Sequence, residues 1–327
     1  MIELRLMTKV PKIAHDSRIY IAGHRGLVGS AIWRYLETMG FTCLLGNSST
    51  EVDLRDQAQT ARAIASAKPE ILIIAAAKVG GIVANSTYPV EFLNENLRIQ
   101  TNLFEAAQSN DIPRVLFLGS SCIYPKFAPQ PISEEALLTG PLEETNDAYA
   151  IAKIAGVMQV ESYRREYHRS WISAMPTNLY GPGDNFDLKT SHVLPALIRR
   201  FHEAKVENAS SITLWGTGNP RREFLHTDDL ARAVLHLLQQ YDAGAPINIG
   251  WGTDLTISQL AALIAEIVGF EGDIKWDSSK PDGTPRKLLN TTKINNLGWQ
   301  PQVELRDGIT STYQWYLDHY HRGGEFG

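Results

Sequence analysis

The sequence is poor in cysteine and has neither a long apolar run nor an excess of positive charge. Only Cys43 and Cys122 are present among 327 residues. Two thiols are too few for a disulfide framework or a thiolate zinc site, so we expect no metal and a reducing, cytoplasmic setting. The longest apolar stretch, residues 71–84, contains Lys78 and two glycines and is too short to cross a bilayer. We therefore expect no membrane partner.

Charges of the two signs are nearly balanced. The chain has 31 Lys and Arg against 36 Asp and Glu, a formal net charge of −5, and 43% of its residues are hydrophobic. These values are ordinary for a globular protein and do not favour a nucleic acid as partner. At roughly 150 residues per domain, the length indicates about two domains. Residues 1–17 lack the continuous hydrophobic core of a secretory signal, so we expect an N-terminal extension there.

Short β-rich runs alternate with longer helical patterns from residue 18 to 177. This alternation is typical of a parallel sheet, and the handedness of βαβ units favours a Rossmann-type, doubly wound α/β domain. The expected strands lie at 18–22, 41–45, 70–77, 114–119 and 171–176. The expected helices lie at 28–39, 57–67, 91–110 and 148–168.

After residue 177 the connections become rich in proline and glycine, and the elements become shorter. We predict that residues 178–327 form a smaller, loop-rich α/β substrate domain. Returning segments could interleave it with the first domain. The helical patterns of this part lie at 192–204, 228–240, 257–268 and 305–320.

A glycine-rich segment connects the first predicted strand to the first predicted helix. It reads Gly23-His24-Arg25-Gly26-Leu27-Val28-Gly29. Glycines let the backbone approach a pyrophosphate closely, and the helix N-terminus supplies free N–H groups and positive potential. An ordinary tight turn is the alternative, but the strand–turn–helix context favours a dinucleotide site. The GxxGxxG spacing resembles the extended branch of the short-chain dehydrogenases/reductases.

The choice of dinucleotide depends on charge near the ribose 2′ position, where a carboxylate favours NAD and a cation favours NADP. The segment 46–49, after the second predicted strand, contains no acidic residue, and Arg25 could meet a phosphate. We therefore predict NADP(H) as cofactor. Asp53 and Leu54 follow the next turn, where relatives contact the adenine, although Asp53 could instead cap a helix.

Two further groups of residues could carry chemistry. Tyr149 and Lys153 are four residues apart on a predicted helix, so phenol and ammonium share one face, and the ammonium would lower the pKa of the phenol. A solvated helix pair is the alternative.

Ser120 and Cys122 stand at a strand end, where ligands of open α/β folds bind. The Ser120 hydroxyl could hold a substrate carbonyl, and a Cys122 thiolate could remove a proton from carbon, although most cysteines are small buried hydrophobes.

Several segments resemble the GDP-L-fucose synthase family from about residue 18 to 317, among them GSSCIYP, YAIAKIAG, SHVLPALIRRFHEA and KPDGTPRKLL. The resemblance implies a homodimeric, NADP(H)-dependent enzyme. It would epimerise C3 and C5 of GDP-4-keto-6-deoxy-D-mannose and then reduce the C4 ketone. The ketone acidifies both neighbouring carbons, so one carbonyl activates both inversions.

The resemblance also implies roles for single residues. Cys122 and His192 match the family's base and acid, and Tyr149 would protonate the C4 alkoxide, supported by Lys153 and Ser120. Besides the glycine loop, it implies cofactor contacts at Ser49, Asp53, Leu54, Leu118, Gly119, Lys153, Pro176, Asn178, Leu179 and His192. It implies contacts to the GDP moiety at Arg200, Trp215, Arg222 and Asp282. For Trp215 the alternative is core packing, and for Arg200 and Arg222 it is a solvated helix or loop face.

The chain departs from the family in the segment after the second predicted strand. Relatives commonly carry arginine where this chain has Asn47 and Ser49, so we expect some tolerance of NADH. The helices at 91–110 and 148–168 suit the family's dimer face.

Two other functions share parts of the pattern. Another extended-branch nucleotide-sugar enzyme, a 4-epimerase or a 4,6-dehydratase, would share the glycine loop and the Tyr-Lys pair. Relatives with dehydratase activity, however, have an acidic pair where this chain has Ser121 and Cys122. A redox-sensing dinucleotide-binding regulator could keep the fold, but such proteins usually lose the Tyr or the Lys, and both remain here.

Overall fold

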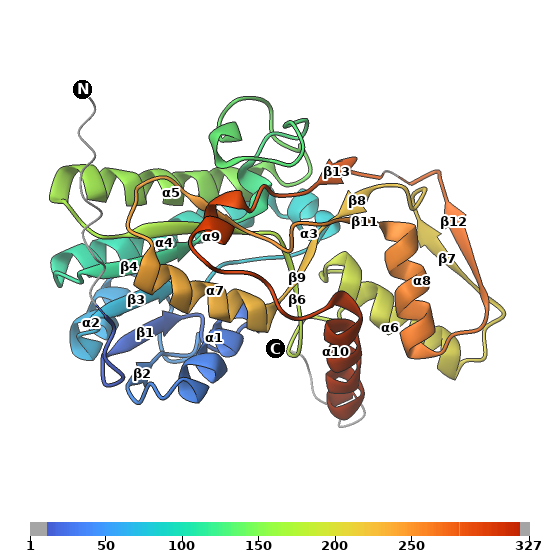
Figure 1. The fold of residues 1–327 in the computed structure, drawn as a ribbon, viewed down its shortest axis with the longest axis horizontal. Helices are drawn as coiled ribbons and strands as arrows, with labels where there is room; N and C mark the ends of the chain where they lie inside the picture. Colours follow the sequence, from blue (N-terminus) through green and yellow to red (C-terminus); the bar gives the residue numbers. More distant parts are fainter. Residues whose placement is uncertain (1–11, 281, 321–327) are drawn as a thin grey trace.

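Six parallel strands form the centre of the molecule. The computed structural model describes residues 12–280 and 282–320 (Figure 1). Its main sheet has the strand order β10-β5-β4-β3-β1-β2. The strands are β1 (Ile19–Ala22), β2 (Leu44–Leu45), β3 (Ile71–Ile74), β4 (Arg114–Leu118), β5 (Ile172–Pro176) and β10 (Ile247–Ile249). The order in which strands are added reverses between β1 and β3. Ligands of such sheets bind outside the carboxyl ends of the strands, here called the carboxyl edge.

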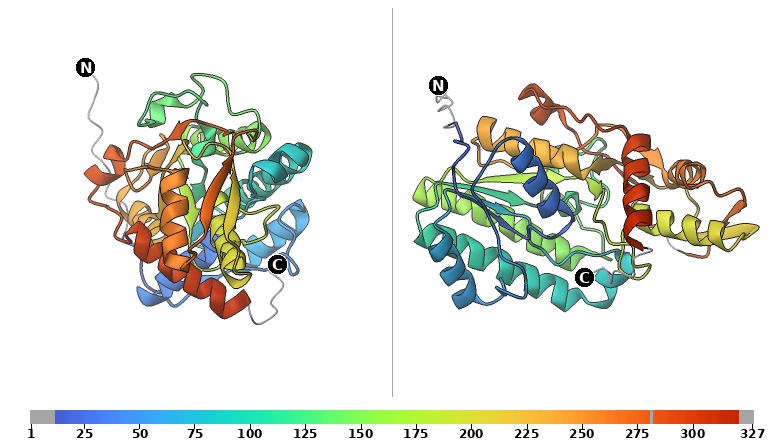
Figure 2. Two further views of the ribbon diagram at one scale, coloured as in Figure 1. Left: turned by 90° about the vertical axis from the view of Figure 1, so that its right-hand side faces the viewer. Right: turned by 90° about the horizontal axis from the view of Figure 1, so that it is seen from below.

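Helices cover both faces of this sheet (Figure 2). One face packs against α1 (Leu27–Thr38) and α7 (Thr227–Gln240), and the other against α2 (Gln57–Ala67), α4 (Pro89–Ser109) and α5 (Asp147–Tyr167). Alternate strand residues point to opposite faces. Ile19 and Ile21 therefore join one core, while Tyr20 joins the other. Because both faces are covered, β1, β2 and β3 are continuous apolar runs rather than alternating ones.

This arrangement confirms the predicted α/β class with a doubly wound sheet. The helix at 57–67 has its predicted bounds, and α1, α4 and α5 differ from prediction by one or two residues at each end. All five predicted strands were too long. Three of them, β1, β4 and β5, are shorter than predicted by one residue, whereas β2 has only two residues and β3 ends at Ile74. Strand β10 was not predicted.

A smaller part with short strands lies beside the sheet. Its core, built around Phe186, Phe201 and Ile264, is separate from the two cores of the main sheet. Its elements are β6 (Asn178–Tyr180), α6 (Val193–Val206), β7 (Ser211–Trp215), β8 (Arg221–Arg222), β9 (Phe224–His226), β11 (Leu255–Thr256), α8 (Ile257–Val268), β12 (Asp273–Asp277), β13 (Arg286–Lys287) and α10 (Leu305–Tyr320). Short helices complete the fold: α3 (Ile82–Thr87), η1 (Ser121–Ile123), η2 (Glu134–Ala136) and α9 (Thr292–Asn296).

The chain crosses between the two parts more than once. Helix α7 and strand β10 follow residue 177 in sequence, yet α7 packs against α1 and β10 pairs with β5. Residue 177 therefore marks the first crossing rather than a single boundary. Glu223 is fully buried where the chain crosses again, and its carboxylate accepts the N–H groups of Gly252 at 2.6 Å and Leu289 at 3.2 Å.

The expected N-terminal extension falls partly outside the described residues. Residues 1–11 are not described. Residues 12–17 lie against the first domain, because Ile13 is buried in the core beside α1 and the His15 ring packs against Phe41 at 5.3 Å between centroids.

Candidate active site

The glycine loop at the carboxyl edge has two glycines that the turn requires and one that it does not. Gly23 has φ +85°, and a methyl group there would lie 2.8 Å from the backbone of Ala76. A methyl group at Gly29 would collide with the carbonyl oxygen of Gly23. Gly26 differs, because its φ is −74° and the nearest protein atom to an added methyl group lies at 3.5 Å. Gly26 is the N-cap of α1 and makes no side-chain cap, so the space before this helix fits a pyrophosphate.

An acidic residue folds back onto the segment after β2, which the sequence pattern did not predict. The Glu51 carboxylate accepts the Ser48 N–H at 2.7 Å and the Ser48 hydroxyl at 2.8 Å, and these bonds lower its pKa. The charges of Arg25 and His24 lower it further. Arg25 and Ser49 are exposed, so both can reach a cofactor at this position. Glu51 is a second reason, besides Asn47 and Ser49, to expect some tolerance of NADH.

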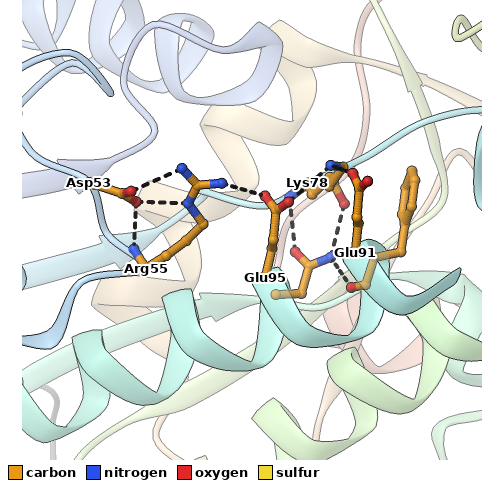
Figure 3. A network of polar contacts seen from close by, with 7 residues as sticks. Asp53, Arg55, Lys78, Glu91 and Glu95 are labelled. Carbon is orange, nitrogen blue, oxygen red and sulfur yellow. Dashed lines mark hydrogen bonds and ion pairs between the residues drawn. The ribbon is translucent and has the colours of Figure 1, made fainter. Parts of the chain in front are cut away.

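Asp53 belongs to a chain of ion pairs that runs alongside α4 (Figure 3). Its carboxylate accepts two 2.9 Å hydrogen bonds from the Arg55 side chain, and Arg55 also pairs with Glu95 at 3.2 Å. Glu95 pairs with Lys78 at 3.0 Å, and Lys78 pairs with Glu91. Asp53 does not cap α2, since Asp56 accepts the N–H of Gln59 there. The adenine contact of Asp53 and Leu54 stays a prediction.

Ser120, Tyr149 and Lys153 meet at the carboxyl end of β4. The Ser120 hydroxyl accepts the backbone N–H of Cys122 at 3.2 Å and hydrogen-bonds to the Tyr149 hydroxyl. Lys153 is buried, donates to the Leu118 carbonyl at 2.9 Å, and lies 5.9 Å from the centroid of the Tyr149 ring. Helix α5 thus presents both of its reactive groups to the carboxyl edge.

The predicted lowering of the Tyr149 pKa by Lys153 was wrong. Burial raises the pKa of Tyr149, the negative charge of Cys122 raises it further, and only the bond to Ser120 opposes this. Burial also lowers the pKa of Lys153 to about 7, so its positive charge is partly lost near neutral pH. The helix spacing predicted that Tyr149 and Lys153 lie close together, but it did not predict how far both groups are buried from solvent. A protonated phenol is the form that can donate a proton to an alkoxide.

Cys122 lies in a pocket built from distant segments, here called the Cys122 pocket. The pocket is lined by residues that include Cys122, Lys126, Glu143, Thr284, Arg286 and Lys287. The sulfur accepts a hydrogen bond from Asn146 Nδ2 at 3.4 Å and one from Lys287 Nζ at 3.5 Å. Asn146 and Lys287 were missed from the sequence. Lys287 ends the KPDGTPRK segment, but nothing in that segment indicates a contact with the sulfur.

His192 is the N-cap residue of α6, with an extended backbone. The residue is exposed overall, but the protein around its imidazole ring keeps water away from the ring. This desolvation disfavours the charged form and lowers the pKa of His192, and the positive charge of Lys287 lowers it further. The prediction of titration near neutrality is therefore corrected toward lower pH. Lys287 thus acts electrostatically on His192 and contacts Cys122, the two groups predicted to move protons.

The other predicted cofactor positions follow the carboxyl ends of two neighbouring strands. Leu118 ends β4 and Pro176 ends β5, so both lie at the carboxyl edge with the glycine loop. Gly119 follows directly after β4, and Asn178 and Leu179 begin β6. Their contacts with a cofactor stay predictions.

The four residues predicted to hold GDP have different surroundings. Arg222 is half-buried, and burial lowers its pKa while the charges of Cys122, Glu143 and Asp282 oppose that shift. Trp215 ends β7 and is 57% exposed. The Asp282 carboxylate accepts the N–H and the hydroxyl of Thr217, each at 2.7 Å, so it also braces the loop after β7. Arg200 lies half-buried on α6.

Within the part of the chain that the structure describes, no group of three or more His, Cys, Asp or Glu side chains is placed to hold a metal ion. None of the helices in residues 12–280 and 282–320 is both long and apolar enough to cross a membrane.

The chain is similar to known proteins over nearly its whole length. Residues 19–250 match the model of the NAD dependent epimerase/dehydratase family. GDP-L-fucose synthase 1 of Arabidopsis thaliana is 57% identical over 302 residues, covering 92% of this chain and 94% of that protein. The GDP-L-fucose synthase of Escherichia coli K12 is 51% identical over 314 residues, covering 93% and 98%. The solved GDP-L-fucose synthetase of Naegleria fowleri bound to NADP has a TM-score of 0.87 and 28% identity, covering 95% of this chain and 97% of that one.

Proposed function

Since the chain belongs to the NAD dependent epimerase/dehydratase family and, within it, to the GDP-L-fucose synthases, we propose that it converts GDP-4-keto-6-deoxy-D-mannose to GDP-L-fucose. One observation supports both stages of this reaction. The Ser120 hydroxyl accepts the backbone N–H of Cys122 and hydrogen-bonds to the Tyr149 hydroxyl, so a candidate carbon base and a candidate oxygen acid lie close together at the carboxyl end of β4. A single C4 carbonyl placed there could be served by both.

The first stage inverts C3 and C5. The Cys122 thiolate takes a proton from carbon, the C–H bond breaks, and an S–H bond forms while the C4 oxygen takes up the negative charge. The Ser120 and Tyr149 hydroxyls are placed to hydrogen-bond this oxygen. The His192 imidazolium then delivers a proton to the opposite face of the carbon. Its lowered pKa makes it a stronger acid for this step.

The second stage reduces the C4 ketone. Bound NADPH supplies the hydride. Tyr149 donates its hydroxyl proton to the C4 oxygen, for which its raised pKa keeps the phenol protonated until that moment. Lys153 is held by the Leu118 carbonyl beneath the Tyr149 ring, where it orients the site and can return a proton to the phenolate.

The glycine loop and the carboxyl edge would hold the cofactor. Gly26 leaves the N-terminus of α1 open to the pyrophosphate, and Arg25 would meet the 2′-phosphate. Arg222, on β8 of the smaller part, would bind the diphosphate of the GDP-sugar. A cytoplasmic setting fits NADPH-dependent reduction and the two free thiols.

We also propose a homodimer through α4 and α5. These helices pack against each other and expose Val90 (68%), Ile151 (47%) and Met158 (41%). Ile151 and Met158 are seven residues apart and share one face of α5. Light scattering should therefore give twice the chain mass, and the double variant Ile151→Glu/Met158→Glu should be a monomer. A monomeric parent protein would reject this proposal.

Incubation with GDP-4-keto-6-deoxy-D-mannose and NADPH tests the function directly. NMR should identify GDP-L-fucose, with one NADPH oxidised per product molecule. Without NADPH, the same mixture in heavy water should exchange the protons at C3 and C5. Stoichiometric tightly bound NAD+ in the purified protein, or a product inverted only at C4, would favour the 4-epimerase or dehydratase class instead.

A further inference from the structure

We propose that Lys287 is a positioning residue that holds the sulfur of Cys122 as a thiolate, ready to take a proton before substrate arrives. This inference rests on the proposed function, in which Cys122 is the base. It goes beyond that function because it assigns the ionisation of the base to a residue from a strand 165 positions away in sequence.

The backbone on both sides of Lys287 is anchored, which fixes where its side chain begins. Strand β13 pairs in parallel with β8, with Lys287 opposite Arg222. The next N–H, from Leu288, donates to Gln130 Oε1 at 2.9 Å, and the Leu288 carbonyl accepts the N–H of Ile132 at 2.7 Å. Leu289 then donates to the buried Glu223. The ammonium is therefore delivered to the sulfur by a rigid frame and not by a mobile loop.

The hydrogen bonds around the sulfur favour its charged form. The bonds from Asn146 and Lys287 both come from nitrogen donors, so the sulfur acts as acceptor in each. A thiolate is a much better acceptor than a thiol, and an ammonium donor adds a favourable charge interaction. Within residues 12–280 and 282–320, no carboxylate lies within ion-pair distance of the Lys287 Nζ.

The other cations of the Cys122 pocket are already paired. Lys126 pairs with Glu143 at 3.0 Å, and Arg286 pairs with Asp254 at 2.5 Å. Arg222 also faces the thiol, but it interacts with Glu143 and Asp282 as well. Tyr149 faces it from α5 as a neutral phenol. Lys287 is thus the cation whose direct contact is the sulfur itself.

The same ammonium favours proton loss from both groups of the proton-transfer pair. It stabilises the thiolate that must accept a proton from carbon, and its charge lowers the pKa of His192, which must give one up. Lys287 therefore favours the deprotonated form of the base, Cys122, and favours proton donation by the acid, His192.

Alkylation of Cys122 by iodoacetamide tests this without substrate or cofactor, because the thiolate is the form that reacts. The two cysteine peptides are followed by mass spectrometry, with Cys43 as reference within each sample. Lys287→Gln should slow labelling of Cys122 at pH 7 roughly tenfold or more and move its rate–pH profile to higher pH. Lys287→Arg should restore most of the rate. Lys126→Gln is the matched control, since it removes a lysine of the same pocket that does not contact the sulfur.

Substrate measurements separate positioning from substrate binding. Lys287→Gln should slow exchange at C3 and C5 in heavy water by a similar factor while KM for the GDP-sugar changes little. Unchanged labelling of Cys122 in folded Lys287→Gln, or equal slowing in Lys126→Gln, would overturn the inference. So would a raised KM with normal labelling, which would make Lys287 a substrate ligand only. If labelling falls as expected but the parent protein forms no GDP-L-fucose, the proposed function fails and the Lys287–Cys122 coupling stands.

Discussion

The glycine loop and the Cys122 pocket lie at the same carboxyl edge of the sheet but are assembled in different ways. The glycine loop is one turn of seven consecutive residues, and its shape depends on the positive φ of Gly23 and on the close approach of the Gly23 carbonyl to Gly29. The Cys122 pocket joins segments around Cys122, Asn146 and Lys287 that meet only in the folded chain. A local turn can be recognised from its glycine spacing and the strand and helix that flank it in sequence, whereas the charge around a thiol is a tertiary property.

Cys122→Ser should damage the pocket and spare the glycine loop. Deuterium exchange at C3 and C5 should fall by at least about 10³-fold, because a serine hydroxyl does not ionise near neutral pH, and loss of a general base typically costs 10²–10⁴-fold. The Kd for NADPH should stay within twofold, and Cys43→Ser should behave as the parent. Exchange that continues undiminished would show that another group is the base.

Gly29→Ala should do the reverse and disrupt the loop. Its methyl group would collide with the Gly23 carbonyl, and overpacking of this kind costs about 3 kcal/mol of unfolding free energy. Gly26→Ala is the matched control, since a methyl group there meets no protein atom within 3.4 Å. It should unfold like the parent but bind NADPH much more weakly in calorimetry. Normal NADPH affinity in Gly26→Ala would refute the proposed path of the pyrophosphate.

The burial of Lys153 should be visible in the pH dependence of stability. Its folded pKa of about 7 lies below its unfolded value, so between the two the unfolded chain binds more protons and stability rises with pH. From pH 7 to 9 this should add about 2 kcal/mol to the parent relative to Lys153→Met. Denaturant titrations at both pH values give the difference. Parallel stability curves for the two proteins would show that Lys153 is charged in the folded state.

The ion pairs of Figure 3 should matter least. Arg55 is half exposed, and surface pairs contribute at most about 1 kcal/mol each. Arg55→Gln should therefore lower the unfolding free energy by no more than about 1 kcal/mol, with less than a threefold change in the Kd for NADPH. A large loss of NADPH affinity would instead show that Arg55 is needed to hold Asp53 in position for its predicted contact with the adenine.

The sequence predicted elements whose signal is local. The run at 71–74 is apolar throughout because helices cover both faces of the sheet, so it was recognisable as a buried strand. Strand β10 has only three residues and joins the sheet beside β5 from far along the chain, and nothing in its own residues indicates that position.

The same limit applies to the active site. The spacing of Tyr149 and Lys153 predicted their meeting, but burial reversed the expected pKa shift of the phenol. Lys287 was missed because its role depends on the pairing of β13 with β8. Glu51 was missed because it reaches the segment after β2 only by folding back onto Ser48.

Tyr149→Phe tests most directly whether one C4 carbonyl serves two separable stages. With substrate and NADPH in heavy water, NMR should show exchange at C3 and C5 within about tenfold of the parent rate, while reduction falls at least about 100-fold. Equal losses of exchange and reduction would contradict the division of labour between Cys122 and Tyr149.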